Sequence, residues 1–297
     1  MGDLALVLGS TGLVGRELLS YMREGGAEWI GVSRSPAGSP CEVCIDLEND
    51  AASLGAVLSA RRPETIFHLA GSASGPDVAA ANVGITRNLF DAIQKIDGYS
   101  PEVLISGSAA EYGNAGPDPI REDAAEQPLT EYGRAKLAQT RLALAKRQEG
   151  LAVTVVRLFN VIGPRMADSL APGRFLRKVR EARERGARTL TTGDLSTVRD
   201  YLDVQDVARG LWALRGRARR AAVVNLCSGK PVRMRALLDE ILRQAGVALD
   251  IVQDPGLVRG PLDIPVSVGD PTLYETLTGE RLNFDLARAI GRLLSDR

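Results

Sequence analysis

Apolar residues follow two alternating patterns along this chain. The first is a short run with few polar interruptions, such as DLALVL at residues 3–8, which is typical of a strand buried on both faces of a sheet. The second is a longer segment with an apolar residue every three or four positions, such as 13–25, which predicts a helix with one buried face. Further strands are predicted at 29–33, 42–46, 65–70, 102–107, 152–159 and 222–228, and further helices at 50–61, 77–96 and 130–149.

The order of these segments predicts the fold class. Strands and helices alternate up to about residue 160, which indicates an α/β fold with a parallel sheet and helices on both of its faces. Beyond that point, proline- and glycine-rich loops separate the remaining helices. We expect residues 1–160 to form the main domain, with elements of 189–228 returning to it, and residues 161–188 and 229–297 to form a smaller C-terminal lobe.

Composition narrows the classes of function. The chain has 297 residues with 37 acidic and 37 basic side chains, so no global field would hold nucleic acid or an anionic membrane. Arginine-rich stretches such as 177–188 are interpreted as solvated helix faces. No apolar run reaches the roughly 20 residues that span a bilayer, and no basic segment precedes the apolar N-terminal stretch. We therefore expect no signal peptide and a cytoplasmic location.

The cysteines do not predict a disulfide framework or a metal site. Cys41 and Cys44 form a C-x-x-C pair that is compatible with a redox site or half a zinc site, and Cys227 stands apart. His68 is the only histidine, so zinc would lack its remaining ligands. We expect the two paired cysteines to be structural and the protein to hold no metal.

A glycine-rich loop follows the first predicted strand and opens the first predicted helix. Its sequence, GSTGLVG at residues 9–15, has the pattern GxxGxxG. Glycines let the backbone approach a pyrophosphate, and a helix N-terminus supplies N–H donors and the positive end of a dipole. We therefore expect a doubly wound Rossmann fold that binds a dinucleotide, although a purely structural turn is the alternative. The contacts expected from this loop are Gly9, Thr11, Gly12, Leu13, Val14 and Gly15.

The end of the second predicted strand distinguishes the two nicotinamide cofactors. An NAD site usually has an acid there to bind the ribose hydroxyls. This chain has Ser33 and Arg34, which suit a 2′-phosphate and favour NADP(H), with NADH as the weaker alternative. Arg34 could also be a plain surface residue. Asp46 and Leu47, after the third strand, are expected beside the adenine, although Asp46 could instead be the N-cap of the next helix or a turn residue.

A tyrosine and a lysine four positions apart are the candidate catalytic group. Tyr132 and Lys136 in YGRAK would share one helix face, and Ser108 ends the predicted strand before them. A neighbouring ammonium stabilises a phenolate and lowers the pKa of a tyrosine. With a serine hydroxyl on the same substrate oxygen, the tyrosine could protonate an alkoxide as a hydride arrives.

These motifs together resemble the extended short-chain dehydrogenase/reductases, in particular the nucleotide-sugar branch. The matching segments span nearly the whole chain: GSTGLVG (9–15), HLAG (68–71), NVGITRNL (82–89), SGSAAEYG (106–113), YGRAK (132–136), RLFNVIGP (157–164), RDYLDVQDVA (199–208) and NLCSG (225–229). Within that branch they look most like the GDP-4-keto-6-deoxy-D-mannose reductases, which form GDP-D-rhamnose. The resemblance implies a nucleotide-diphosphate sugar as substrate and a homodimer.

The resemblance also implies roles for individual residues. Ser108 and Tyr132 would contact the sugar ketone, and Lys136 would hold the nicotinamide ribose. Arg199 and Arg259 would bind the diphosphate, although an ion pair with Asp200 or Asp203 is an alternative for Arg199. The other implied cofactor contacts are Leu69, Ala70 and Gly71, and the other implied substrate contacts are Ala109, Glu111, Asn160, Arg174 and Asp263.

Relatives on this scaffold carry out different reactions, so the reaction needs separate evidence. A 4,6-dehydratase has an Asp-Glu pair after the strand-end hydroxyl, where this chain has Ala109 and Ala110. A 4-epimerase usually keeps a bound NAD, which Ser33 and Arg34 disfavour. Reduction of a 4-keto sugar by NADPH is the expectation. The alternatives are an epimerase, a reductase of a dTDP- or CDP-linked deoxysugar, and an NADP-binding regulatory protein without activity.

Overall fold

The computed structural model describes residues 4–35, 38–72, 78–217, 219–257 and 264–295. Its centre is a seven-stranded parallel sheet with strand order β10-β6-β5-β4-β1-β2-β3. This sheet confirms the predicted α/β Rossmann class. Its strands are β1 (Ala5–Leu8), β2 (Trp29–Ser33), β3 (Glu42–Cys44), β4 (Thr65–His68), β5 (Glu102–Ser108), β6 (Ala152–Leu158) and β10 (Val223–Leu226).

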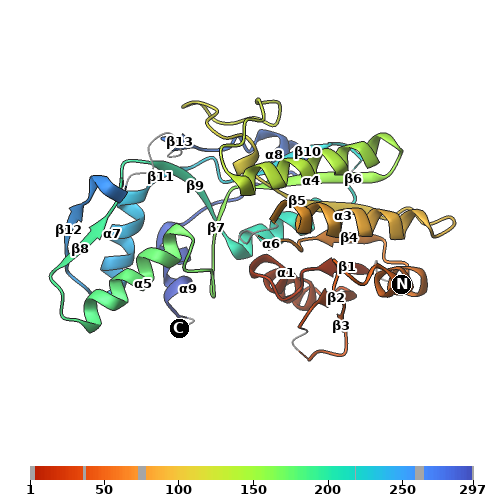
Figure 1. Cartoon of the computed structure of the whole chain (residues 1–297), viewed down its shortest axis with the longest axis horizontal. Coiled ribbons are helices and arrows are strands. Elements are labelled where there is room, and N and C mark those ends of the chain that lie inside the picture. The colour runs from red at the N-terminus through yellow and green to blue at the C-terminus, as the bar shows by residue number, and fades with distance from the viewer. Residues whose placement is uncertain (1–3, 36–37, 73–77, 218, 258–263, 296–297) are drawn as a thin grey trace.

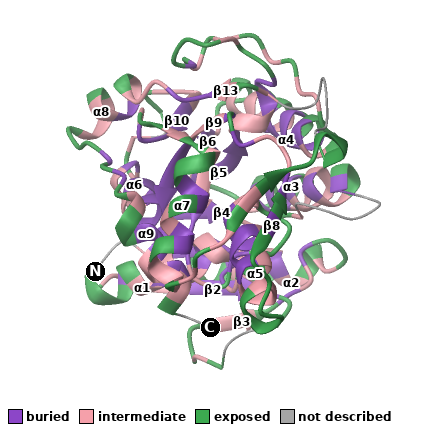
Figure 2. Cartoon of the chain, turned by 90° about the vertical axis from the view of Figure 1, so that its left-hand side faces the viewer, coloured by how far each residue is buried: buried purple, intermediate pink, exposed green. Residues whose placement is uncertain are grey.

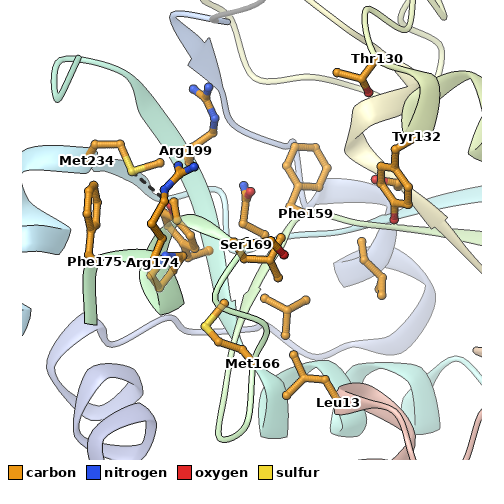
Figure 3. Close-up of a pocket in the computed structure, with 18 of the residues that line it drawn as sticks. Leu13, Thr130, Tyr132, Phe159, Met166, Ser169, Arg174, Phe175, Arg199 and Met234 are labelled. Carbon is orange, nitrogen blue, oxygen red and sulfur yellow. Dashed lines mark hydrogen bonds between the residues drawn. The ribbon is translucent and has the colours of Figure 1, made fainter. Parts of the chain in front are cut away.

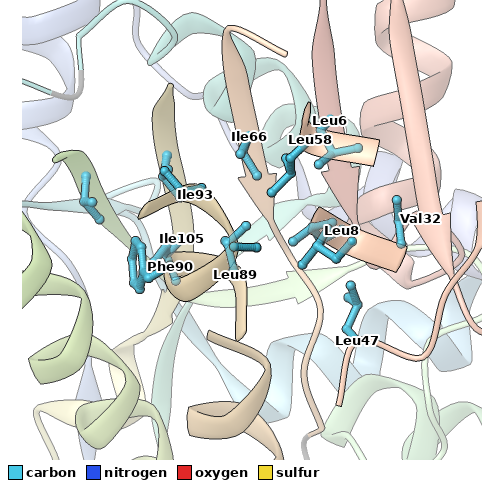
Figure 4. Packing of buried hydrophobic residues seen from close by; sticks show 14 of the residues in the cluster. Leu6, Leu8, Val32, Leu47, Leu58, Ile66, Leu89, Phe90, Ile93 and Ile105 are labelled. Atoms are coloured by element: carbon cyan, nitrogen blue, oxygen red, sulfur yellow. The ribbon is translucent and has the colours of Figure 1, made fainter. Parts of the chain in front are cut away.

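Helices cover both faces of this sheet because side chains along each strand alternate between the faces. Leu6 and Leu8 of β1 belong to a core shared with one group of helices (Figure 4), whereas Ala5 and Val7 belong to the core on the opposite face. The first group consists of α2 (Ala51–Arg61), α3 (Val78–Gln94) and α4 (Glu131–Gln148), and the opposite face holds α1 (Leu13–Glu24), α6 (Val204–Ala213) and α8 (Thr272–Thr278).

A second, smaller region lies beside the sheet and has its own apolar core (Figure 1). It contains a four-stranded sheet and a two-stranded parallel sheet, with the helices α5, α7 and α9 packed around them. Its strands are β7 (Asn160–Ile162), β9 (Val198–Asp203), β11 (Pro231–Arg233) and β13 (Val266–Ser267), then β8 (Thr189–Thr192) and β12 (Asp250–Gln253), and its helices are α5 (Ala171–Glu184), α7 (Met234–Ala245) and α9 (Leu286–Ser295).

The chain crosses between the two regions more than once. β8 pairs with β12 in the smaller region, whereas α6 packs against α1 and β10 extends the large sheet beside β6. Two short 3-10 helices complete the order, η1 (Ala109–Glu111) after β5 and η2 (Pro255–Leu257) after β12. The central strands of the large sheet are almost wholly buried, whereas the edge strand β3 and the outer faces of the helices are partly or fully exposed (Figure 2). Among the described residues, no helix has the length and apolar character needed to cross a membrane.

Candidate active site

A cavity of ≈ 970 Å³ lies between the carboxyl ends of the parallel strands and the smaller region. On the sheet side, its walls include the glycine loop after β1, the segment after β4 and the end of β5. On the other side, they come from α5, which contributes Arg174 and Phe175, from β9, which contributes Arg199 (Figure 3), and from β8. The carboxyl edge of an open parallel sheet is where such folds bind ligands, so this cavity is the candidate site.

The glycine loop has the geometry that a dinucleotide requires. Gly9 has φ +86°, and a Cβ there would come within 2.7 Å of the backbone nitrogen of Ala70, so only glycine fits between β1 and the segment after β4. Helix α1 begins at Leu13 with no side-chain cap and no acidic residue in its first turn. Its amide groups therefore face the cavity without a competing carboxylate. Of the predicted contacts, Gly9, Gly12, Leu13, Val14, Gly15, Leu69 and Gly71 line the cavity, while Thr11 and Ala70 do not.

The residues predicted to select the cofactor lie beside this loop, outside the cavity itself. The backbone nitrogens of Gly9 and Ser10 both donate to the carbonyl oxygen of Val32, 2.9 and 3.2 Å away, which ties the loop to the end of β2. Ser33 follows directly and its hydroxyl is buried, whereas Arg34 is exposed. An exposed guanidinium at this edge suits a phosphate on the adenosine ribose.

Asp46 lies next to this edge and is a turn residue. Its carboxylate accepts hydrogen bonds from the backbone nitrogen of Glu48 at 3.1 Å and from the side chain of Asn49 at 2.9 Å. These bonds lower the pKa of Asp46. The alternative that Asp46 caps the following helix is wrong, because Asp50 caps α2 by accepting from the backbone nitrogen of Ser53. Leu47 is buried in the core under α2 and α3.

Helix α4 carries the candidate catalytic pair on one face. Thr130 caps it by accepting from the backbone nitrogen of Gly133 at 3.0 Å, which places Tyr132 in the first turn and Lys136 one turn later. A Cβ on Gly133 would lie 2.5 Å from the carbonyl oxygen of Ala110, so glycine allows α4 to approach η1 closely. Ser108, Tyr132 and Lys136 all line the cavity.

The side chain of Lys136 is buried and hydrogen-bonded at two of its three donors. Its Nζ donates to the carbonyl oxygen of Ser106 at 2.5 Å and to Oε1 of Gln139 at 2.8 Å. Burial lowers the pKa of Lys136 to about 8, and the carboxylate of Glu111 acts in the opposite direction. Lys136 is therefore a cation whose protonation changes within an ordinary working range of pH.

The pKa of Tyr132 differs from the sequence-based hypothesis. We expected the neighbouring ammonium to lower it, but burial raises it, a hydrogen bond with Ser108 opposes that effect, and the charge of Glu111 adds to it. The lysine is directed at the Ser106 carbonyl and Gln139 instead. A raised pKa keeps Tyr132 protonated at neutral pH, so its hydroxyl can donate a proton, but it makes the phenol a weaker acid than the lowered pKa we expected would.

Glu111 lies behind the cavity and not in its wall. Its Oε1 accepts from the backbone nitrogen of Ser108 at 2.8 Å, and its Oε2 accepts from Nε of Arg157 at 2.8 Å and from the hydroxyl of Thr140 at 2.9 Å. The Glu111 side chain is fully buried and does not line the cavity, so it lies out of reach of a substrate there. The predicted substrate contact at Glu111 does not match this placement, and Ala109 also lies outside the lining.

The smaller region contributes the polar end of the cavity. Asn160, Arg174 and Arg199 all line it. Asn160 donates from Nδ2 to the backbone oxygen of Asp200 at 2.8 Å, which joins β7 to β9. The carboxylates proposed as alternative partners for Arg199 have other contacts: Asp200 accepts from Ser228, Gly229 and Gly269, and Asp203 caps α6. The predicted residues Arg259 and Asp263 lie outside the described residues.

Several residues of this end were not predicted from the sequence. Lys178 lines the cavity one helical turn after Arg174, although its stretch was interpreted as a solvated helix face. Their i, i+4 spacing was the signal, because it places both cations on one face of α5. Met166, Asp194 and Met234 also line the cavity, and nothing in their local sequence distinguishes them.

The cysteines show no metal-binding arrangement. Cys41 and Cys44 are exposed and free, and Cys227 is buried and free. Within the described ranges, no group of three or more His, Cys, Asp or Glu residues could hold a metal ion.

Comparison with known proteins identifies the family. Residues 5–227 match the model of the NAD dependent epimerase/dehydratase family. The chain belongs to this family. The match confirms the resemblance to the extended short-chain dehydrogenase/reductases.

Individual relatives cover most or all of the chain. The GDP-6-deoxy-D-mannose reductase of Pseudomonas aeruginosa is 32% identical over 100% of this chain and 97% of its own length. The dTDP-6-deoxy-L-talose 4-dehydrogenase (NAD(P)(+)) of Kitasatospora kifunensis is 30% identical over 84% of this chain and 81% of its own length. Among solved structures, RMD from Pseudomonas aeruginosa in complex with NADPH aligns with a TM-score of 0.84 and 30% identity, covering 100% of this chain and 97% of that one.

Proposed function

We propose that this protein is an NADPH-dependent oxidoreductase that reduces the 4-keto group of a nucleotide-linked 4-keto-6-deoxyhexose. The substrate proposed is GDP-4-keto-6-deoxy-D-mannose, with GDP-D-rhamnose as product. One observation carries the proposal: Ser108, Tyr132 and Lys136 line the same cavity as the glycine loop and as Arg174 and Arg199. The reductase of Pseudomonas aeruginosa, alike over its whole length, supports this choice of substrate.

The residues of the cavity can divide the reaction between them. NADPH, when bound, supplies a hydride for carbon 4 of the sugar. Tyr132 gives its hydroxyl proton to the carbonyl oxygen, and Ser108 hydrogen-bonds to the same oxygen. Lys136 holds the nicotinamide ribose with its remaining donor. Arg199 and Arg174 bind the diphosphate, for which forked guanidinium groups are suited, and Asn160 contacts the nucleotide sugar.

Two features favour net reduction over the other reactions of the family. Arg34 is exposed beside the glycine loop and suits the 2′-phosphate of NADPH, a cofactor that can leave after one hydride transfer. Ala109 and Ala110 replace an acid and a base after Ser108, and both carboxylate oxygens of Glu111 are occupied behind the cavity. Dehydration therefore lacks its acid–base pair.

The test is NADPH oxidation with GDP-4-keto-6-deoxy-mannose made in situ by a dehydratase. NADH and dTDP-4-keto-6-deoxy-glucose are the controls. Turnover with NADPH and the GDP-sugar is the expected result. Turnover with the dTDP-sugar alone would move the enzyme to another deoxysugar, and no oxidation of bound NADPH with either sugar would favour the epimerase.

Assembly and location complete the proposal. We infer a homodimer through α3 and α4, as the resemblance to the extended short-chain dehydrogenase/reductases implies. Sedimentation at micromolar concentration should give twice the monomer mass of 31.7 kDa, and only monomer would refute it. Three free cysteines, two of them exposed, support a reducing compartment such as the cytoplasm.

A further inference from the structure

A chain of buried hydrogen bonds runs from Lys136 into the protein. Gln139 is 1% exposed, and its Oε1 accepts from Lys136. Because an ammonium can only donate, the amide oxygen must face the lysine and the amide nitrogen must face away. That nitrogen, Nε2, donates to the hydroxyl of Thr86 on α3 at 2.8 Å.

The direction of each bond in this chain follows from the number of protons available. The hydroxyl of Thr86 donates its single proton to the backbone oxygen of Asn82 at 2.8 Å. It must therefore accept from Gln139 and also from Nε2 of His68, which lies 2.8 Å away. His68 consequently carries its proton on Nε2, and its Nδ1 is unprotonated.

No member of this chain can take a proton from Lys136. The amide of Gln139 is neutral, the oxygen of Thr86 already accepts two bonds, and Nε2 of His68 is already protonated. Burial also lowers the pKa of His68 to about 3, so the imidazole stays neutral. This series of hydrogen bonds therefore holds the Lys136 side chain in place and does not conduct protons.

We propose that Gln139 is a positioning residue that fixes the ammonium of Lys136 against the Ser106 carbonyl, and that its neutral amide sets the upper pH limit of activity. This inference rests on the proposed function, in which Lys136 must be charged. Among the described residues, the charged or titratable groups around Lys136 are Tyr132 on its own helix, Glu111 of η1, His68 of β4 and Arg157 of β6. Arg157 is paired with Glu111. Because the Gln139 amide carries no charge, a charged side chain at position 139 should shift the pH above which activity is lost.

The experiment compares kcat from about pH 6 to about pH 10 for the NADPH-saturated enzyme and two variants. Gln139→Glu places a carboxylate against the ammonium and should move the basic limb of the profile up by roughly 1 pH unit. Gln139→Met removes the hydrogen-bond acceptor while keeping a similar side-chain volume, and it should move the basic limb of the profile to lower pH. Gln94→Glu is the matched control, because Gln94 also accepts from a lysine, Lys146 at 3.0 Å, but at the exposed ends of α3 and α4.

The titration of Lys136 itself separates this inference from the proposed function. The protein has only five lysines, so their ¹³Cε resonances can be followed individually against pH. The resonance that is missing from the Lys136→Arg spectrum is the one that belongs to Lys136. Opposite shifts in the two variants support the role of Gln139 even if the sugar tested is not the substrate. An unchanged Lys136 titration in both variants, with only a lower melting temperature, would make Gln139 a packing residue and overturn the inference.

Discussion

Nε of Arg157 lies 2.8 Å from Oε2 of Glu111, and neither side chain has any exposed surface. The guanidinium also pairs with Glu126 and lies 4.4 Å from the centroid of the Tyr112 ring. The other carboxylate oxygen of Glu111 holds the backbone nitrogen of Ser108. A buried ion pair thus fixes, from behind, the strand end that carries the candidate catalytic serine.

Removing one member of this pair should destabilise the fold strongly. Glu111→Gln removes the fully buried counter-charge of Arg157 and leaves only the partly exposed Glu126, so the loss in the free energy of unfolding should reach at most about 3–5 kcal/mol. Urea denaturation measures this change in the free energy of unfolding. Asp239→Asn is the matched control, because its pair with Arg235 has the same 2.8 Å separation but is exposed, and it should cost less than about 1 kcal/mol. Equal losses in both variants would contradict the prediction.

Tyr132→Phe should abolish catalysis and leave cofactor binding intact. The variant lacks only the proton that reaches the carbonyl oxygen, so kcat should fall by roughly 10²–10⁴. NADPH affinity, measured by fluorescence, should be unchanged. Tyr21→Phe on the exposed side of α1 is the control and should keep full activity. A Tyr132→Phe protein that turned over normally would refute the role of this tyrosine.

Arg34→Ala should weaken the preference for NADPH over NADH. Loss of a charge-assisted bond to a phosphate costs about 1.5–3 kcal/mol, roughly tenfold to a hundredfold in Kd. Binding of NADH should hardly change, because it lacks the 2′-phosphate. Titration calorimetry with both cofactors measures this difference, and Arg61→Ala at the end of α2 controls for surface charge. Parallel losses for both cofactors would indicate a general effect on the loop.

Arg199→Lys and Arg199→Ala should separate substrate binding from chemistry. Arg199 lies at the end of the cavity away from Tyr132 (Figure 3), so its loss should raise KM for the nucleotide sugar by roughly tenfold or more. The lysine variant keeps the charge but not the fork and should recover only part of the affinity. NADPH affinity should not move. A fall in kcat at unchanged KM would contradict the diphosphate role.

His68 should remain neutral far below its ordinary range, with the proton on Nε2. Burial lowers its pKa to about 3, whereas its ordinary pKa is near 6.5. Between these two pH values the unfolded chain therefore binds a proton that the folded chain does not bind. The corresponding stability is complete above about pH 6.5 and is lost progressively as the pH falls toward 3. His68→Gln should flatten this acid dependence.

The imidazole can be observed without assignment, since His68 is the only histidine. Its ¹⁵N spectrum should show a protonated Nε2 and a bare Nδ1 that do not change between about pH 5 and 8. A titration centred near pH 6.5 would overturn both the burial argument and the tautomer.

The strands and helices of the large sheet could be predicted closely because their signals are local. The apolar run at 29–33 matches β2 residue for residue, and helix α4 differs from the predicted 130–149 by one residue at each end. The order of glycines after β1 and the spacing of Tyr132 and Lys136 are also local, and they placed the nucleotide loop and the candidate catalytic pair on the correct elements.

Contacts between distant segments were beyond such reasoning. Glu111 was expected in the substrate site, but Arg157 lies 46 positions away along the chain and draws its carboxylate inward. The pKa of Tyr132 was expected to fall, but burial by surrounding elements raises it, and Lys136 is held by Ser106 and Gln139.

Residue order alone therefore specifies the parallel sheet, the glycine loop and the set of candidate catalytic side chains, since each depends on spacing within one strand, turn or helix. The direction in which each polar side chain donates, the residues that end up behind the site, and the pKa of each reacting group depend on desolvation and on partners brought together by packing. Thr86, Gln139 and His68 come from three different elements, and only the folded chain joins them to Lys136.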